Sequence, residues 1–411
     1  MPDSQISVEP FAIHLSDAVL EDLRARIRAT RWPDDAAGSD WDHGADPEYL
    51  RSLLQTWAED FDWREQERKL NELPHFRARI DGRHVHFVHR RGAGPDPLPI
   101  VLTHGFPSSF LEHLPLLPLL TEFDLVIASL PGYGFSDPLM EPMTEATLGD
   151  IWLRLMHDGL GYSRFGAHGS DVGTGPTLQL GLRHPEHVVG IHLSAFYLDL
   201  PPEPWPPAVQ RFVEWQRTER PQDTAYSRMQ STRPLTAAYG LTDSPAALAA
   251  WIVDLFRTFS DCGGDVESRI SREHLLTNLT LYWATWSIGP AMRGYYDFAH
   301  FEPPLPPGTR WEVPAGFAVF ADSYRPGAPR TPRELAEPYV SPPRRRAAWR
   351  SHGGGAPPGR TRPGARAGRA SSRDGRARPV CHRPRRRGTR RRAARAGITV
   401  GVRRRSRARR L

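Results

Sequence analysis

The sequence predicts an α/β protein with a mostly parallel sheet flanked by helices, and three observations support that fold class. Strand-like and helix-like segments alternate along residues 1–340, with turn residues between them. The strand-like segments are continuous apolar runs, as expected for strands that are covered on both faces. The chain has 411 residues, 39% of them hydrophobic, which is enough for one large catalytic domain with additions or for two medium domains.

The predicted elements follow in order from the N-terminus. Residues 1–75 are expected to be mainly helical, because Leu20, Leu23 and Ile27 recur at a helical spacing and form one apolar stripe. Residues 200–300 are helix-like and rich in aromatic side chains, which predicts a helical lid over the carboxyl edge of the sheet with a pocket beneath it. Strands are predicted between and after these regions, at residues 98–103, 124–130, 165–169, 188–194 and 316–320.

Charge separates the last part of the chain from the rest. Residues 341–411 hold 25 Arg, no Lys and one acid, so their net charge is +24, while residues 1–340 carry −17 of the total of +7. This Arg-rich tail has too few large apolar residues to offset chain entropy, and we expect it to be disordered.

Three interpretations of the tail stay open. It is an arm that binds nucleic acid or anionic lipid without sequence preference, a solvated tail without function, or the out-of-frame translation of a GC-rich gene. We favour the third as a hypothesis, because the chain has one Lys, Lys69, against 53 Arg.

Composition also limits the class of protein. Cys262 and Cys381 are too few for a disulfide framework or a four-thiolate zinc site, so a reducing compartment such as the cytoplasm is expected. The sequence has no run of about 18 apolar residues and no signal-peptide pattern, so neither a membrane span nor secretion is expected. No phosphate-binding loop, dinucleotide fingerprint or metal-ligand cluster is found, and we therefore expect no cofactor and no metal.

The strongest local signal is the segment 169–174 (GSDVGT), at the end of a predicted strand and before a helix. Small residues two positions before and two after Asp171 permit the strained turn of a nucleophile elbow, which lifts one side chain clear of the sheet. A carboxylate is ionised at neutral pH and can attack carbon to form an ester intermediate. Taken alone, the segment also fits a helix N-cap Asp in a Gly-rich turn.

A second motif strengthens the catalytic interpretation. Residues 104–107 (HGFP) follow an earlier predicted strand, and the backbone amides of Phe106 and Val172 are expected to form an oxyanion hole for breakdown of the ester. From about residue 8 to about residue 340 the sequence now resembles the epoxide hydrolases of the microsomal and juvenile-hormone type, which have the α/β-hydrolase fold. The resemblance includes residues 30–34 (TRWPD), 62–64 (DWR), 130–136 (LPGYGFS) and 243–252 (DSPAALAAWI).

The resemblance implies a role for each matching residue. Asp171 is expected to be the nucleophile, with Phe106 and Val172 as the oxyanion donors. Tyr226 and Tyr295 match the two lid tyrosines of the family, whose phenolic hydroxyls hydrogen-bond the ring oxygen of the epoxide and donate a proton as the ring opens. Without the resemblance, either tyrosine is more simply explained as lid packing.

The sequence departs from the family pattern in two places. The family usually has Trp after the nucleophile, whereas this chain has Val172, which keeps the backbone amide but changes the pocket wall. Asp322 is the best match for the acid that orients a water-activating histidine. The family's Arg-Gly-Gly-His-Phe pattern for that histidine is missing, because His352 has the wrong neighbours and His382 and His300 are unsuitably placed. We therefore assign no base.

The predicted function is the addition of water to a small epoxide to give a vicinal diol, with ester hydrolysis impaired by the missing base. The alternatives are a haloalkane dehalogenase-like hydrolase, which uses the same Asp elbow, and an inactive hydrolase body whose Arg tail binds nucleic acid. The oligomeric state is not predicted. The expected regions are an N-terminal epoxide-hydrolase-type region at 1–95, the hydrolase core at 96–199, the lid at 200–300, an incomplete last core region at 301–340 and the Arg-rich tail at 341–411.

Overall fold

One sheet of nine strands organises the computed structural model, which describes residues 6–34, 40–194, 200, 203–218, 223–306, 308–320, 329–340 and 348–351. The order across the sheet is β1-β2-β3-β5-β4-β6-β7-β8-β9, and all pairs from β5 to β9 are parallel. The predicted α/β class with a mostly parallel sheet is therefore confirmed. The strands are β1 Ser7–Pro10, β2 His75–Ile80, β3 Arg83–Arg90, β4 Pro99–Thr103, β5 Asp124–Ala128, β6 Phe165–Ser170, β7 Val188–Ser194, β8 Ala315–Val319 and β9 Ala348–Ser351.

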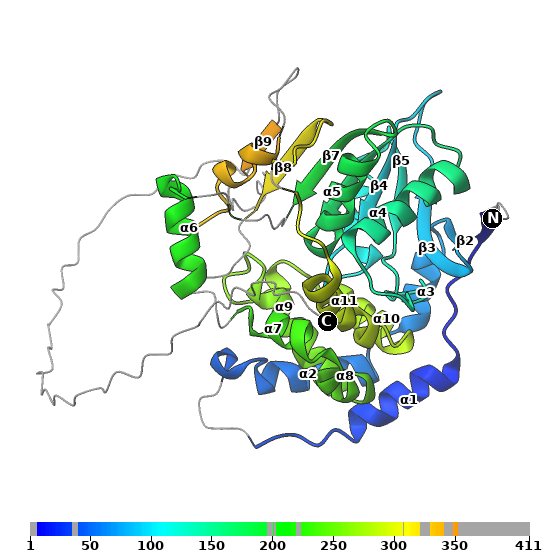
Figure 1. Ribbon diagram of the computed structural model, residues 1–411. Helices are drawn as coiled ribbons and strands as arrows, with labels where there is room; N and C mark the ends of the chain where they lie inside the picture. The colour runs from blue at the N-terminus through cyan, green and yellow to red at the C-terminus, as the bar shows by residue number, and fades with distance from the viewer. Residues whose placement is uncertain are drawn as a thin grey trace, which may run out of the picture. The chain divides into compact units, whose positions relative to one another are not determined.

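The helices form three groups along the chain (Figure 1). The N-terminal group is α1 Asp17–Arg28, α2 Pro47–Glu59 and α3 Trp63–Leu70. Helices α4 Glu145–Leu153 and α5 Thr174–Arg183 lie against the parallel strands. The region predicted as a lid is helical and consists of α6 Pro207–Thr218, α7 Ala225–Thr232, α8 Pro234–Asp243, α9 Pro245–Thr258, α10 Arg272–Ala284 and α11 Ile288–Phe301.

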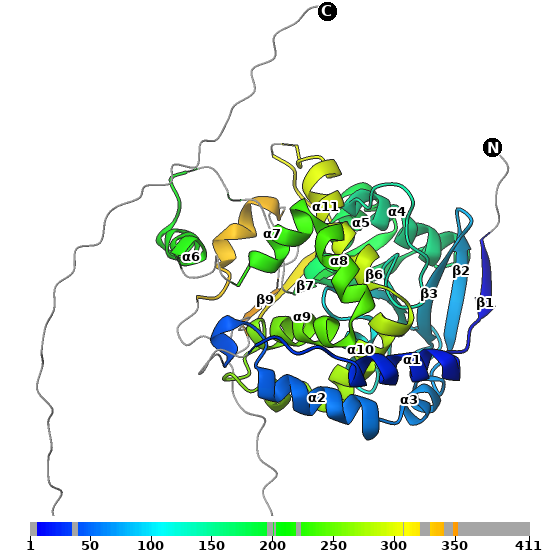
Figure 2. The same ribbon diagram turned by 90° about the horizontal axis from the view of Figure 1, so that it is seen from below.

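The N-terminal helices lie beside the lid helices, as Figure 2 shows for α2 with α9 and α10. The indole Nε1 of Trp57 on α2 donates a hydrogen bond to Oγ1 of Thr280 on α10 at 2.9 Å, and both side chains are buried. The hydroxyl of Tyr49 donates to Glu267 at 2.9 Å. These contacts tie segments more than 200 residues apart in the chain, so the N-terminal region supports the lid.

An antiparallel hairpin extends the sheet on its N-terminal side, and the sequence reasoning missed it. Strands β2 and β3 pair across a turn at Asp81 and Gly82, whose φ values are +51° and +80°. An Asp-Gly pair at positive φ is a favoured two-residue hairpin turn. The first strand, β1, adds to the outer edge of this hairpin within the region that had been expected to be mainly helical.

The parallel strands carry the site at their carboxyl ends. Strand β5 is buried along its whole length, as its apolar sequence predicted. The strand predicted at 188–194 has the same bounds in the structure, and the other predicted strands differ by one or two residues at their ends. Neighbouring strands β4 and β6 end at Thr103 and Ser170, so the two loops that follow them meet at one edge of the sheet.

Of the tail predicted to be disordered, the structure describes residues 348–351. These residues form β9, which pairs parallel to β8 and continues the sheet. Backbone pairing at the edge of an existing sheet needs few apolar residues, which is why the short segment gave no strand signal. Residues 1–355 make up one compact unit, and a second unit, 356–411, lies outside the described residues. None of the helices in the described ranges is long and apolar enough to span a lipid bilayer.

Candidate active site

Asp171 lies at a sharp turn between the end of β6 and the start of α5. Its φ is +48°, a left-handed conformation that residues other than Gly seldom adopt. A Cβ on Gly169 would lie 2.0 Å from the carbonyl oxygen of Gly173, and a Cβ on Gly173 would lie 2.3 Å from that of Thr103. The two glycines let strand, turn and helix approach closely, so the turn has the geometry of a nucleophile elbow.

The loop after β4 brings its backbone to Asp171. A Cβ on Gly105 would lie 2.4 Å from the Cβ of Asp171, so a glycine is required for this approach. The amide of Phe106 donates a hydrogen bond to Oδ1 of Asp171 at 3.0 Å. Val172 follows Asp171 and lines the cavity described below. The loop predicted to supply an oxyanion donor therefore contacts the predicted nucleophile.

Two side chains of helix α10 hold the same loop, and sequence reasoning missed both. The side-chain amide of Asn278 donates to the carbonyl oxygen of Pro107 at 2.9 Å. The hydroxyl of Tyr282 donates to the backbone carbonyl oxygen of Ser108 at 2.8 Å. Both residues are buried and lie one helical turn apart. The available signal was an Asn within the apolar segment 275–283 (LLTNLTLYW), because a buried amide requires hydrogen-bond partners.

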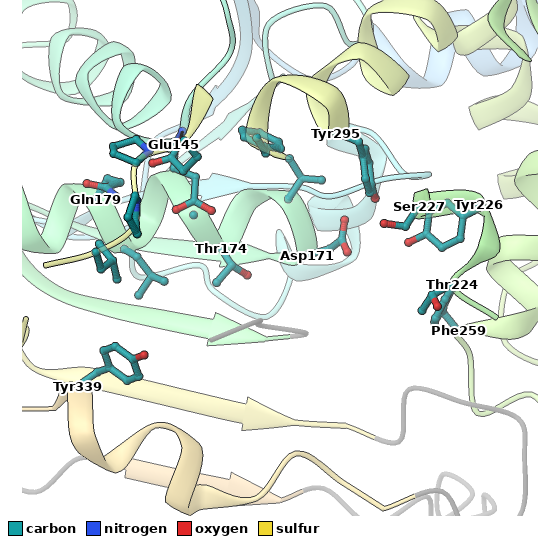
Figure 3. A pocket seen from close by; sticks show the side chains of 18 residues that line it. Glu145, Asp171, Thr174, Gln179, Thr224, Tyr226, Ser227, Phe259, Tyr295 and Tyr339 are labelled. Carbon is teal, nitrogen blue, oxygen red and sulfur yellow. Dashed lines mark hydrogen bonds between the residues drawn. The ribbon is translucent and has the colours of Figure 1, made fainter. Parts of the chain in front are cut away.

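The lid places two phenols next to Asp171. Tyr226 on α7 and Tyr295 on α11 have ring centroids 6.0 Å apart, with an angle of 70° between the ring planes. Both rings pack against Phe106, with centroid distances of 6.3 and 5.6 Å. Figure 3 shows the two phenolic oxygens directed toward the carboxylate of Asp171. The structure therefore brings both predicted tyrosines to the predicted nucleophile.

Burial controls the acidity of the Tyr295 phenol. It raises the pKa of Tyr295 well above the ordinary value, and the negative charge of Asp171 and the neighbouring Tyr226 raise that pKa further. Burial also raises the pKa of Tyr133, with Asp171 as a smaller cause. The hydroxyl of Tyr295 therefore stays protonated at neutral pH, as a hydrogen-bond donor to a developing alkoxide must.

A cavity of about 590 Å³ lies in front of the carboxylate of Asp171. A volume of that order is typical of small-molecule sites. Tyr226, Tyr295 and Val172 line the cavity together with Asp171. Tyr339, which follows β8, also lines it and had not been predicted. The other lining residues are Glu145, Thr174, Gly175, Leu178, Gln179, Thr224, Ser227, Phe259, Phe298, Glu302, Pro303, Pro304 and Leu305.

Of the residues considered for ester hydrolysis, only His300 is among those that the structure describes. Asp322, His352 and His382 lie outside the described residues. His300 is exposed, and its ring stacks at 4.0 Å on Tyr296, the neighbour of Tyr295. No histidine is among the described residues that line the cavity. In the same described ranges, no three His, Cys, Asp or Glu side chains are arranged to hold a metal ion.

Comparison with known proteins identifies the family. Residues 8–113 match the epoxide hydrolase N terminus, and residues 99–285 match the alpha/beta hydrolase fold. The chain is 36% identical over 330 residues to a protein of Stigmatella aurantiaca (strain DW4/3-1) that is named provisionally as an epoxide hydrolase, covering 76% of this chain and 74% of that protein. It is 30% identical over 365 residues to epoxide hydrolase 1 of Oryctolagus cuniculus, covering 76% and 78% of the two chains.

Solved structures agree with the sequence comparison. The epoxide hydrolase of Aspergillus niger superposes with a TM-score of 0.72 at 28% identity, over 85% of this chain and 90% of that one. The α/β-hydrolase fold is thereby confirmed, and the haloalkane dehalogenase and non-catalytic alternatives are not favoured. The chain belongs to the epoxide hydrolases, and it is a hydrolase that acts on epoxides.

Proposed function

We propose that Asp171 opens the epoxide by attacking a ring carbon. A bond forms between a carboxylate oxygen and that carbon, the bond from the same carbon to the ring oxygen breaks, and the resulting alkoxide takes a proton from Tyr226 or Tyr295. The observation that carries this proposal is the convergence of two phenolic oxygens and one carboxylate on a single cavity. The hydrogen bond from Phe106 supports it, because it orients the carboxylate toward the ring.

The second half of the proposed reaction is ester hydrolysis. Water adds to the ester carbonyl, and the amides of Phe106 and Val172 stabilise the oxyanion until the diol leaves and the carboxylate is restored. Asp322 is the proposed acid partner of a base that the sequence does not identify. Because the Arg-Gly-Gly-His-Phe pattern that carries the base in the family is missing from the sequence, we propose that ester formation is much faster than ester hydrolysis.

Intact-mass analysis after incubation with an aryl epoxide tests both halves. We expect a persistent adduct with the mass of one epoxide, on the peptide that contains Asp171. The Asp171→Asn variant, with its fold checked by circular dichroism, should give no adduct, because a neutral amide is a poor nucleophile. An unmodified, folded wild-type protein that releases no diol contradicts the assignment of Asp171. Rapid diol release without adduct contradicts the slow second half.

The location and partners are also proposals. We propose that the protein is cytoplasmic and that its partners are a small epoxide and water. Any binding of nucleic acid is proposed to occur through the Arg-rich tail and without sequence preference. The small number of cysteines supports the reducing compartment, and Cys262 is buried and unpaired. Cell fractionation tests the location. Duplex binding that falls steeply with salt and is lost on deletion of residues 341–411 tests the tail.

A further inference from the structure

The end of the cavity opposite the tyrosines is polar and acidic. Figure 3 shows Asp171, Tyr226 and Tyr295 at one end and Glu145 and Gln179 at the other. The acidic end is completed by Glu302, at the C-terminus of α11, and we call these three side chains, Glu145, Gln179 and Glu302, the far subsite. Nothing in the ring-opening reaction requires polar groups at this distance from the carboxylate.

Gln179 is the first observation that points to a ligand in the far subsite. Its side chain is 8% exposed and lines the cavity from the middle of α5. It makes no hydrogen bond with any residue in the described ranges. Its amide is not among the fully buried, unpaired polar atoms of the described residues, so it is accessible from the cavity, where a ligand can pair with it.

Glu302 is the second observation. Its Oε2 accepts a hydrogen bond from the backbone amide of Glu145 at 2.6 Å, which places the carboxylate at the N-terminus of α4. Its Oε1 is buried and has no hydrogen-bond partner among the described residues. One oxygen thus caps a helix, and the other is a buried acceptor whose charge acts on the cavity through the protein. Burial raises the pKa of Glu302, as expected for a carboxylate without a cationic partner.

The charge of the wall is the third observation. The described residues that line the cavity include the carboxylates of Glu145, Asp171 and Glu302 but no Arg, Lys or His. The positive charge of Arg183 acts on Glu302 and lowers its pKa slightly against the effect of burial, but the Arg183 guanidinium is paired with Asp150 at 2.8 Å. Because water is partly excluded from the cavity, these carboxylates favour a cation and disfavour an anion there.

We propose that the far subsite binds the protonated amine of an epoxide substrate while Asp171 attacks its ring. The ammonium N–H donates to the side-chain carbonyl of Gln179, and the carboxylates of Glu145 and Glu302 add electrostatic attraction. The five steps along α5 from Thr174 to Gln179 rise about 8 Å along the helix axis, which sets the length scale of the chain between ring and amine. This proposal rests on the proposed role of Asp171.

A matched pair of epoxides tests the far subsite. One epoxide ends in a dimethylammonium group, and the other ends in the isopropyl group of the same shape without charge or donor. Both are prepared with a series of spacer lengths around about 8 Å. We expect the ammonium epoxide to form the Asp171 ester about tenfold faster than the isopropyl epoxide, with an optimum spacer. Equal rates for the two at every spacer length overturn the proposal.

Two variants assign the preference to named groups. Glu302→Gln removes the charge but keeps a carbonyl oxygen for the amide of Glu145, and Gln179→Leu replaces the amide by an apolar group of similar size. In either variant we expect most of the preference for ammonium to be lost, measured as the ratio of the rates for the two epoxides in the same protein. The control Glu122→Gln removes an exposed carboxylate outside the cavity and should keep the preference. An unchanged preference in both test variants overturns the proposal.

Binding of the two diol products separates this inference from the proposed function. The diols need no attack by Asp171, and titration calorimetry with the wild-type protein does not depend on the folding of a variant. Tighter binding of the ammonium diol supports the far subsite even when neither epoxide modifies Asp171, a result that defeats only the proposed function. Equal affinity of the two diols overturns the far subsite even when both epoxides form the ester.

Discussion

Tyr226 and Tyr295 are the two proposed donors for one oxygen, so each should partly replace the other. At the residue scale we expect Tyr295→Phe or Tyr226→Phe to slow ester formation about tenfold or more, and the double variant to slow it at least about 1,000-fold. The expected loss is in the maximum rate, because an alkoxide needs a donor only as the ring opens. Rapid-mixing intact-mass kinetics measure these rates.

The control for the tyrosines is their neighbour in the chain. Tyr296 stacks on His300 and is not among the described residues that line the cavity, so Tyr296→Phe should leave the rate unchanged. A double variant at Tyr226 and Tyr295 that reacts at the wild-type rate contradicts the proposed proton donors.

Gly173 is a residue whose missing side chain shapes the site. In Gly173→Ala the new Cβ collides with the carbonyl oxygen of Thr103, and we expect a loss of about 2–4 kcal/mol in the free energy of unfolding. Gly240→Ala is the matched control, since nothing lies within 4 Å of its Cβ and Ala is the better helix former by about 1 kcal/mol. Urea unfolding of both variants measures the difference. Equal stability of the two contradicts the packing of the elbow.

At the scale of elements, helix α10 connects the lid with the loop that contacts Asp171. Asn278→Leu and Tyr282→Phe each leave a buried loop carbonyl without its donor, so we expect losses of about 1–3 kcal/mol in stability. Ester formation should also slow, because the loop carries the amide of Phe106. Thr277→Val on the same helix removes only a hydrogen bond to Glu273 and should leave the rate unchanged. Reduced stability with a wild-type rate in the first two variants contradicts the coupling of α10 to the site.

The elements differ in how well the sequence predicts them, for physical reasons. Strands such as Asp124–Ala128 are buried on both faces, so their continuous apolar runs are visible in the sequence. The hairpin of β2 and β3 mixes His and Arg with apolar residues, and its signal is the Asp81-Gly82 turn, which was overlooked. Strands β1 and β9 have four residues each, and so short a segment carries little local preference for strand structure. Both form because they pair with a neighbouring strand.

Within the site, features set by short sequence segments could be predicted, whereas contacts between residues far apart in the chain could not. The elbow at Asp171 and the loop at Phe106 follow from short segments in which Gly is required by close backbone contact, so the sequence reveals them. The support of that loop by Asn278 and Tyr282 joins residues 171 and 174 positions apart. The unpaired groups of Gln179 and Glu302 likewise become visible only when α4, α5 and α11 are brought together.

At the scale of the whole molecule, buried histidines connect the N-terminal hairpin with the parallel sheet. Nε2 of His75 donates to the carbonyl oxygen of Leu70 at 2.8 Å, and Nδ1 of His75 accepts from Nε2 of His86 at 2.9 Å. On the other side of the His86 ring, Nδ1 lies 2.9 Å from Oγ of Ser129. This chain of bonds uses neutral tautomers of both rings. Burial lowers the pKa of His86 well below the ordinary value, and burial lowers the pKa of His104 to about 4.

Acid should therefore destabilise the protein before its carboxylates titrate. The folded state keeps His75, His86 and His104 neutral, whereas in the unfolded chain each binds a proton below about pH 6.5, so the unfolded state takes up more protons as the pH falls. For His104 the free energy of unfolding should be unaffected above pH 6.5, fall by about 2 kcal/mol by pH 5 and level off near its folded pKa of about 4. Urea unfolding between pH 8 and pH 5 measures how steeply the free energy of unfolding falls with pH. His86→Asn should make this fall smaller. The control His43→Gln, at an exposed position, should leave it unchanged. A stability that is constant down to pH 5 contradicts the neutral histidine network.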